Sequence, residues 1–264
     1  MKVSIITPLY NCSDFLEQTI KSVLAQTYEN WEMIMVDDCS TDNSLEIAKE
    51  YASKDRRIKI IELTENSGAA VARNTAIEAA TGRFIAFLDS DDIWLPEKLE
   101  KQVMFMQNNN IAFSYTAYEK MTEDGIVFGK NYIPKKVNYK TLLKTNIIGC
   151  LTAMYDTHKL GKVYMPLIRK RQDFGLWLRI LKKEPYAFGI QEILGQYRLR
   201  SGSISSNKRS AAKFTWRLYR VVEKLNLLQA SYYFVHYAIN GVLRTKLPHL
   251  NKRIRRKNGT EKTI

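Results

Sequence analysis

The first hundred residues alternate short apolar runs with stretches of helical periodicity. Four of the apolar runs predict strands: 3–10, 31–38, 58–63 and 84–89. Three stretches between them predict helices: 14–25, 42–52 and 68–80. Regular alternation of strand and helix is typical of a parallel sheet that is covered by helices on both faces. We therefore expect an α/β fold.

The pattern is less regular after residue 95. A helix is predicted from Pro96 to Gln107, because proline at the first helical position costs no hydrogen bond. Residues 111–128 predict two strands joined around Glu123-Asp124-Gly125, a hairpin signal. Residues 139–195 mix short helices and strands, and the clearest helix among them is 173–181.

The basic residues are concentrated at the C-terminal end. The formal net charge is +14, and residues 196–264 account for the whole excess with 16 Lys and Arg against two acidic residues. In 211–226, four apolar residues recur at helical spacing beside a parallel basic stripe. Residues 227–243 are apolar but interrupted, and shorter than the ~20 residues that a membrane-spanning helix needs. We expect these helices to lie on a membrane or to pack on the body of the protein.

The three cysteines are Cys12, Cys39 and Cys150, and their wide spacing suggests neither a zinc cluster nor a disulfide framework. The first residues contain no secretory signal pattern. Both features favour a cytoplasmic protein.

Polar clusters follow three of the predicted strands, at 7–11, 37–42 and 89–92. Ligands of parallel sheets bind at the carboxyl ends of the strands, so one crevice could hold all three clusters.

The carboxylates of 89–92 come directly after a buried strand, where several negative charges lie close together. A divalent cation relieves their repulsion, and Mg²⁺ and Mn²⁺ prefer carboxylate and phosphate oxygen ligands. We take Asp91 as the metal ligand and Asp89 as the contact to the ribose of a nucleotide. The alternative is an acidic turn that caps the following helix.

The other two clusters suit a nucleotide. Asp38 could accept the imide hydrogen of uracil, Tyr10 could stack on the base, and backbone groups near Thr7 could bond its edge. In 66–74, glycine and small residues at a helix start allow a ligand to approach, and Arg73 is within reach of the same crevice. The alternatives are a tyrosine that only packs above its strand and an ordinary ion pair of Arg73.

Asp173 begins a predicted helix after a basic loop. It is either an N-terminal cap or a general base that removes the proton of an acceptor hydroxyl as that oxygen attacks an anomeric carbon. A single displacement of this kind inverts the anomeric configuration.

Taken in order, these segments resemble the blocks of the family 2 glycosyltransferases, which have the GT-A fold. The resemblance covers roughly residues 1–205. The segments that carry it are VSIITPLYN, QTYENWEMIMVDDCSTDNS, NSGAAVARN, GRFIAFLDSDDIWLPEKL, and QDFGLWLRI followed by YRLRSGSIS.

The resemblance implies a Rossmann-like GT-A domain at 1–205, with a mostly parallel mixed sheet flanked by helices. Its nucleotide-sugar-binding half would be 1–95 and its acceptor-binding half 96–205, followed by a basic helical segment at 206–264. The resemblance gives Asp91 to a Mn²⁺ or Mg²⁺ ion and the base role to Asp173. The residues expected to contact the nucleotide sugar are Thr7, Pro8, Tyr10, Asn11, Asp38, Asn66, Arg73, Asp89, Ser90 and Asp91.

The chain departs from the family pattern at two positions. Gln172 stands where the family often has glutamate, which keeps the base and removes its acidic neighbour. Arg200 stands where many members have histidine, which puts a second protein ligand for the metal in doubt. Arg198 and Arg200 are expected to contact the diphosphate or a loop instead.

The chain looks most like family members that build bacterial capsule, O-antigen and teichuronic acid. This likeness implies a UDP-sugar donor and a saccharide or undecaprenyl-diphosphate-linked acceptor. The basic segment fits an anionic membrane surface, so we expect a peripheral protein at the inner face of the cell membrane.

Three other classes of protein are alternatives to a glycosyltransferase. A sugar nucleotidyltransferase would have a glycine-rich basic loop after the first strand, and a dinucleotide-dependent oxidoreductase would have GxGxxG there. This chain has Pro8-Leu9-Tyr10-Asn11-Cys12 at that place. The third is a non-catalytic scaffold with an RNA-binding tail. The intact set of aspartates argues against it, and no nucleic-acid partner is expected.

Overall fold

The computed structural model describes residues 1–200 and 208–246. In chain order, its strands are β1 (Val3–Leu9), β2 (Trp31–Asp37), β3 (Ile58–Glu62), β4 (Phe84–Phe87), β5 (Ile93–Trp94), β6 (Phe113–Met121), β7 (Val127–Asn131), β8 (Lys136–Val137), β9 (Met154–Asp156) and β10 (Ala187–Arg198). Its α-helices are α1 (Ser13–Leu24), α2 (Ser44–Lys54), α3 (Ala69–Ala79), α4 (Lys98–Asn108), α5 (Tyr139–Lys144), α6 (Thr157–Leu160), α7 (Gln172–Lys183), α8 (Lys208–Arg217) and α9 (Leu227–Lys246).

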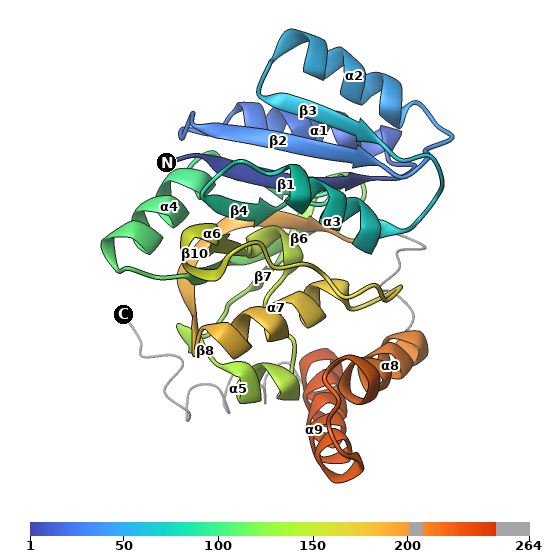
Figure 1. Cartoon of the computed structure of the whole chain (residues 1–264), viewed down its shortest axis with the longest axis vertical. Helices are drawn as coiled ribbons and strands as arrows, with labels where there is room; N and C mark the ends of the chain where they lie inside the picture. Colours follow the sequence, from blue (N-terminus) through green and yellow to red (C-terminus); the bar gives the residue numbers. More distant parts are fainter. Residues whose placement is uncertain (201–207, 247–264) are drawn as a thin grey trace.

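The strands form one mixed sheet in the order β3-β2-β1-β4-β9-β6-β10-β5, with β7 beside β6 and β8 beside β10 (Figure 1). The run from β3 to β4 is parallel. β9 is antiparallel to both of its neighbours, and β6 and β10 are parallel again. The predicted α/β fold is confirmed, and the description "mostly parallel" applies to the first half of the sheet only.

Alternate side chains of the buried strands enter two cores on opposite faces of the sheet. Ile5 and its neighbours on one face pack with α1 residues such as Leu16 and Ile20. Ile6 faces the other way and packs with α3 residues such as Ile77. This alternation follows from the period of two along a strand. The continuous apolar runs seen in the sequence are therefore explained by burial on both sides.

The second half begins with a small departure from the prediction. Helix α4 begins at Lys98, because Pro96 and Glu97 form a turn in which the N–H of Lys98 donates to the carbonyl of Leu95 (3.0 Å). Pro96 is thus not the first helical residue. The hairpin is confirmed: β6 and β7 are antiparallel, and Gly125 in their turn has a φ of 83°.

The predicted helix near 173–181 is confirmed as α7. Its Trp177 packs on Phe87 of β4 and Phe113 of β6, with ring centroids 5.3 and 5.4 Å apart. This packing holds α7 against the middle of the sheet. The first turn of α7, which contains Asp173, is fixed by the same contacts.

The C-terminal segment is helical, as predicted, but divided. A single π-helical stretch (Leu218–Val222) follows α8, and α9 comes after a short turn. These helices lie at the opposite end of the molecule from α2 and β3 (Figure 1). They pack on the body through buried contacts, including the ion pair between Glu223 and Lys182 (2.7 Å) and the hydrogen bond from Tyr219 to the carbonyl of Leu143.

Among the described residues, we find no helix that is long and apolar enough to cross a membrane. The predicted domain boundary at residue 205 lies outside the described residues.

Candidate active site

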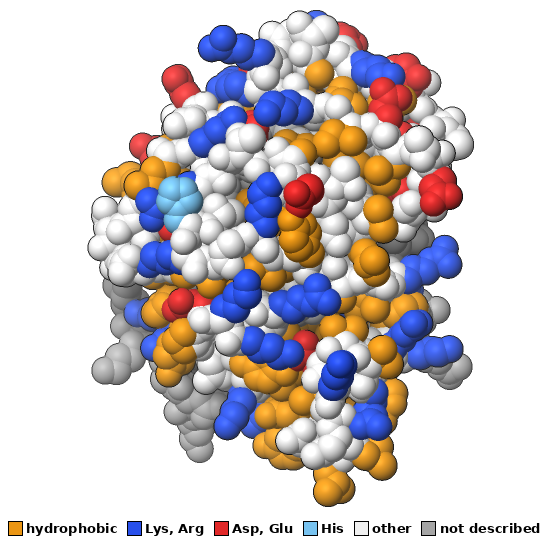
Figure 2. Space-filling model, viewed as in Figure 1, with side chains coloured by type: hydrophobic (Ala, Val, Ile, Leu, Met, Phe, Trp, Pro, Cys, Tyr) orange, Lys and Arg blue, Asp and Glu red, His pale blue; other side chains and the backbone are white. Residues whose placement is uncertain are grey.

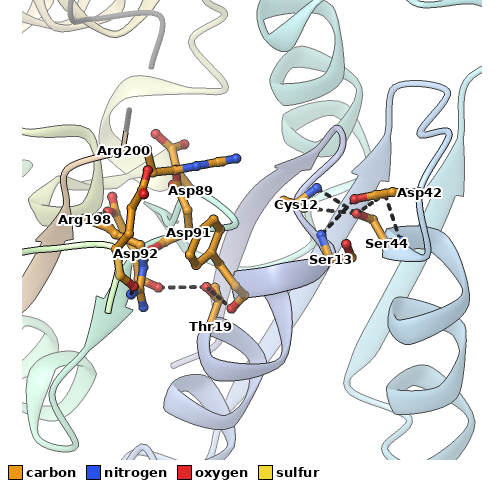
Figure 3. A network of polar contacts seen from close by, with 12 residues as sticks. Cys12, Ser13, Thr19, Asp42, Ser44, Asp89, Asp91, Asp92, Arg198 and Arg200 are labelled. Carbon is orange, nitrogen blue, oxygen red and sulfur yellow. Dashed lines mark hydrogen bonds and ion pairs between the residues drawn. The ribbon is translucent and has the colours of Figure 1, made fainter. Parts of the chain in front are cut away.

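The loops that follow β1 and β2 are joined by polar contacts. Asn11 accepts hydrogen bonds through its side-chain oxygen from the N–H (2.8 Å) and hydroxyl (3.3 Å) of Thr41. Asp42 accepts hydrogen bonds from the N–H groups of Ser13 and Ser44 (both 3.0 Å), which are the first residues of α1 and α2. Figure 3 shows Ser13, Asp42 and Ser44 in one view with the carboxylates that follow β4. The sheet therefore brings together strand ends that are far apart in the sequence, as expected.

Asp38 is buried at the end of β2, with 3% of its surface exposed. Its carboxylate accepts hydrogen bonds from the N–H groups of Ser67 (2.6 Å) and Gly68 (2.8 Å), at the start of α3. The side chain of Asn66 donates to the carbonyl of Asp38 (2.9 Å). Gly68 has a φ of 88°, which favours glycine. Asp38 thus shapes the loop before α3, and its contact with uracil stays a prediction.

The side chains predicted near the base differ in exposure. Tyr10 is 52% exposed at the end of β1, so its ring is available for stacking. Thr7 is fully buried within β1, and its hydroxyl has no partner among the described residues, so its contact with a base stays a prediction. Pro8, which follows Thr7 in β1, is partly buried.

The carboxylates after β4 are balanced by arginines. Arg73 donates to Asp89 at 2.5 Å. Arg200 donates to Asp91 at 3.2 Å, and both of these residues are shown in Figure 3. Burial and the charge of Asp89 raise the pKa of Asp91, although Arg200 opposes the shift. Asp92 is buried, and burial together with the charges of Asp91 and Asp89 raises its pKa well above the ordinary value. Negative charge is therefore crowded here, as the sequence predicts.

Arg73 lies between this cluster and α7, the helix that carries Asp173. Only 8% of its surface is exposed. Burial lowers the pKa of Arg73, but the charge of Asp89, the hydrogen bond to it and the charge of Asp173 outweigh burial and raise the pKa above the ordinary value. Asp89 and Asp173 therefore act on the same buried cation.

Asp173 lies in the first turn of α7, and it is not the cap. The N-cap is Arg171, which has a left-handed φ of 67°, and no side chain caps the helix. The carboxylate of Asp173 accepts a hydrogen bond from the side chain of Asn146 (3.5 Å). The capping alternative is therefore wrong, while the role of general base stays a prediction.

Arg198 was predicted to contact either a diphosphate or a loop, and the structure shows loop contacts. Its side chain is buried, and its guanidinium donates to the carbonyls of Asp91 (2.8 Å) and Glu123 (2.6 Å) and to the side chain of Gln18 (2.7 Å). Its backbone N–H donates to Asp92 (2.9 Å). Arg198 thus links the acidic loop to the β6–β7 turn and to α1, because oxygen atoms of these three segments accept its hydrogen bonds. Arg200 is more exposed and forms an ion pair with Asp91, while its contact with a diphosphate stays a prediction.

Three residues of the site were missed by sequence reasoning. Asn146 contacts Asp173, and the thiol of Cys150 lies 3.9 Å from Asp89. The third is Asp92, which the sequence shows only as one member of an acidic run. Ser90, in contrast, was predicted to contact the donor, but it is buried and forms a hydrogen bond with Cys12. No local pattern marks Asn146 or Cys150, since each meets its partner across a long stretch of sequence.

The residues fit a divalent metal ion that arrives with a phosphate ligand. Asp91 and Asp89 offer hard carboxylate oxygens in a place where their mutual repulsion favours a cation. Among residues 1–200 and 208–246 there is no group of three or more His, Cys, Asp or Glu side chains able to hold a metal alone. A metal held by Asp91 would take its other ligands from phosphate and water. The contact of Asp89 with the ribose stays a prediction.

The fold and this arrangement of side chains place the protein in the GT-A class of glycosyltransferases. The sequence profile of glycosyl transferase family 2 matches residues 4–161, and the chain belongs to that family.

Two curated relatives match nearly the whole chain. TuaG of Bacillus subtilis strain 168, a protein named for teichuronic acid biosynthesis, is 52% identical over 91% of this chain and 96% of its own. WfgD of Escherichia coli is 44% identical over 94% of this chain and 97% of its own, and is named as a UDP-Glc:alpha-D-GlcNAc-diphosphoundecaprenol beta-1,3-glucosyltransferase. The predicted family is confirmed.

Solved structures share the fold. Staphylococcus aureus TarS 1-349 in complex with UDP-GlcNAc has a TM-score of 0.73 and 23% identity, over 95% of this chain and 78% of that chain. The mannosyltransferase PcManGT from Pyrobaculum calidifontis, in complex with GDP-Man and Mn²⁺, has a TM-score of 0.67 and 17% identity, over 88% of this chain and 69% of that chain. At these identities, the likeness concerns the fold alone.

Proposed function

We propose that this glycosyltransferase moves a sugar from a UDP-sugar to a hydroxyl of a saccharide acceptor, with inversion at the anomeric carbon. The observation that carries the proposal is the position of Arg73, which is buried and bound to Asp89 at 2.5 Å. The charge of Asp173 adds to the effect of Asp89 in raising the pKa of Arg73. Asp89, the proposed contact to the donor, and Asp173, the proposed base, both interact with Arg73 and therefore belong to a single site. Such a site suits a reaction between two bound substrates.

In the proposed reaction, Asp173 accepts the proton of the acceptor hydroxyl while that oxygen attacks the anomeric carbon. The hydrogen bond from Asn146 orients the carboxylate, and the packing of Trp177 fixes its helix. The protein needs no nucleophile of its own, because the bond to the leaving diphosphate breaks as the new bond forms. Asp91, with Asp89 beside it, would hold Mn²⁺ or Mg²⁺, which when bound supplies positive charge to the leaving diphosphate.

The relatives support the substrate classes. WfgD is named for a UDP-glucose donor and a diphosphoundecaprenol-linked acceptor, and TuaG for teichuronic acid biosynthesis. We infer a UDP-sugar donor and a saccharide acceptor carried on undecaprenyl diphosphate for this chain too. The pathway would be the synthesis of a cell-surface polysaccharide.

A lipid-linked acceptor requires the enzyme to work at a membrane. The 16 basic residues of 196–264 would be attracted to an anionic lipid surface. We infer a cytoplasmic protein that associates peripherally with the inner face of the membrane.

Calorimetric titration with UDP tests the donor site. We expect binding that depends on Mn²⁺ and is stronger for UDP than for GDP or CDP. Asp91→Ala should abolish the dependence on metal, because it removes the proposed ligand. Preference for another nucleotide would change the donor, and a failure to bind any of the three would contradict the proposal.

A further inference from the structure

Helix α9 has one face that packs on the body of the protein. Ala230 is fully buried, and the ring of Phe234 packs edge-on against Trp216 of α8 (centroids 5.4 Å apart). Tyr237 accepts a hydrogen bond from Arg171, and Asn240 donates to the carbonyl of Lys144 (3.2 Å). These contacts fix the rotation of α9 about its axis and therefore decide which side chains face outward.

The outward face carries four large apolar side chains at helical spacing. Leu228, Tyr232, Val235 and Ile239 are 83%, 51%, 55% and 51% exposed, and we call them the α9 apolar stripe. Their spacing of four, three and four residues puts them in one row along the helix. Figure 2 shows hydrophobic side chains over the end of the molecule that α9 occupies in Figure 1. Contiguous exposed apolar surface of this kind marks an interaction site.

Basic residues flank the segment of the α9 apolar stripe on both sides in the sequence. Residues 225–243 contain no Asp, Glu, Lys or Arg. The exposed bases Arg220 and Lys224 precede this stretch, and Arg244 and Lys246 follow it in the sequence. The ammonium of Lys144 lies 5.3 Å from the ring of Tyr232. Beyond α9, residues 247–264 add six bases and one acid.

We propose that the α9 apolar stripe lies in the interfacial region of a bilayer that contains anionic lipid, with the flanking bases at the level of the headgroups. An apolar row bordered by Lys and Arg is the pattern of a helix that lies in the plane of a membrane. The proposal specifies the surface behind the peripheral association inferred above, and does not depend on the transfer reaction.

Charge decides between this occupant and two others. A second copy of the chain would bring the same bases together across a symmetric interface, where like charges repel. A nucleic acid would neutralise the bases but would leave the apolar side chains without a partner. An anionic bilayer offers negative headgroups to the bases and an apolar interior to the α9 apolar stripe.

This docking would also set the position of the active site. Tyr237, on the packed face of α9, binds Arg171, which is the N-cap of α7 and lies two residues before Asp173. A bilayer at the α9 apolar stripe would therefore lie close to the helix that carries the proposed base. That position suits an acceptor whose lipid anchor stays in the membrane.

The test is co-sedimentation of the full-length protein with vesicles of phosphatidylcholine alone, or of phosphatidylcholine with phosphatidylglycerol. The variant Leu228→Ser/Ile239→Ser removes two members of the stripe and changes no charge. Met104→Ser is the matched control, because Met104 is 52% exposed on α4, a helix outside the C-terminal segment. We expect binding to the anionic vesicles, a drop of about tenfold or more for the stripe variant, and no change for the control.

Two results would overturn the proposal: a stripe variant that sediments like the wild type, or a wild-type dimer in solution that the stripe variant converts to a monomer. Titration with UDP in the absence of vesicles separates this proposal from the proposed function. If the wild type fails to bind UDP while its vesicle binding still needs the stripe, the donor proposal fails and the docking proposal stands.

Discussion

Replacing Arg73 tests whether the buried cation holds the acidic cluster together. The guanidinium is 8% exposed and lies 2.5 Å from Asp89, whose side chain is 27% exposed. Removing one partner of a buried ion pair costs about 3–5 kcal/mol. Water at the partly exposed Asp89 reduces this cost. Arg73 Nε has no hydrogen-bond partner among the described residues, so its removal also removes an unsatisfied donor.

For Arg73→Gln, we therefore expect the free energy of unfolding to fall by about 2 kcal/mol, below the cost for a fully buried pair. Urea denaturation at neutral pH measures this fall. Arg57→Gln is the matched control: it breaks the ion pair with Asp55 (2.7 Å), whose side chains are 34% and 20% exposed, and it should cost less than about 1 kcal/mol. Equal losses for the two variants would refute the reasoning.

Asp173→Asn should lower the rate of transfer by about 10²- to 10⁴-fold and leave UDP binding intact; single-turnover rates at normal speed would exclude the base role. Lys98 is buried without a hydrogen-bond partner, and burial lowers its pKa well below the ordinary value. The folded chain therefore holds the proton of Lys98 less tightly than the unfolded chain does, so stability should rise with pH. Lys98→Met should be more stable than the wild type near neutral pH, and this advantage should shrink in urea titrations at higher pH. Burial raises the pKa of Glu32, but hydrogen bonds from Lys59, Ser4 and Lys2 outweigh burial and lower it. The stability that Glu32 provides is present above its ordinary pKa and is lost as the pH falls; Glu32→Gln should cost about 2 kcal/mol at neutral pH and less in acid, as measured by denaturation.

The first half of the fold could be predicted because its signals are local. The apolar runs of β1 to β4 and the polar residues after them are read directly from the sequence, and the parallel sheet then brings Asp38, Asp89 and Asp91 to one edge. Small errors remain where a turn and a helix start look alike, as at Pro96.

The environment of each site residue could not be predicted in the same way. Arg198 was expected to contact a diphosphate or a loop, but its partners include Gln18, which lies 180 residues away in the sequence. The contact of Asn146 with Asp173 and the left-handed conformation of Arg171 likewise depend on tertiary packing. Residue type and spacing indicate the chemistry, whereas packing decides which donors remain free for a ligand.

The α9 apolar stripe shows the same limit. Helical periodicity in 211–243 predicts apolar faces but does not say which face packs on the body. That choice comes from Ala230, Phe234 and Tyr237, which are in contact with α8 and α7. The remaining apolar side chains become a candidate docking surface only once this face is known.

The most direct test of the central claim is transfer from UDP-sugars to a lipid-linked saccharide diphosphate in the presence of Mn²⁺. The new anomeric centre would be read by proton NMR, for the wild type and for Asp173→Asn. We expect the wild type to form a β-linked product from an α-linked donor, and Asp173→Asn to form almost none. Retention of the α configuration, normal turnover by Asp173→Asn, or no transfer from any UDP-sugar would contradict the account.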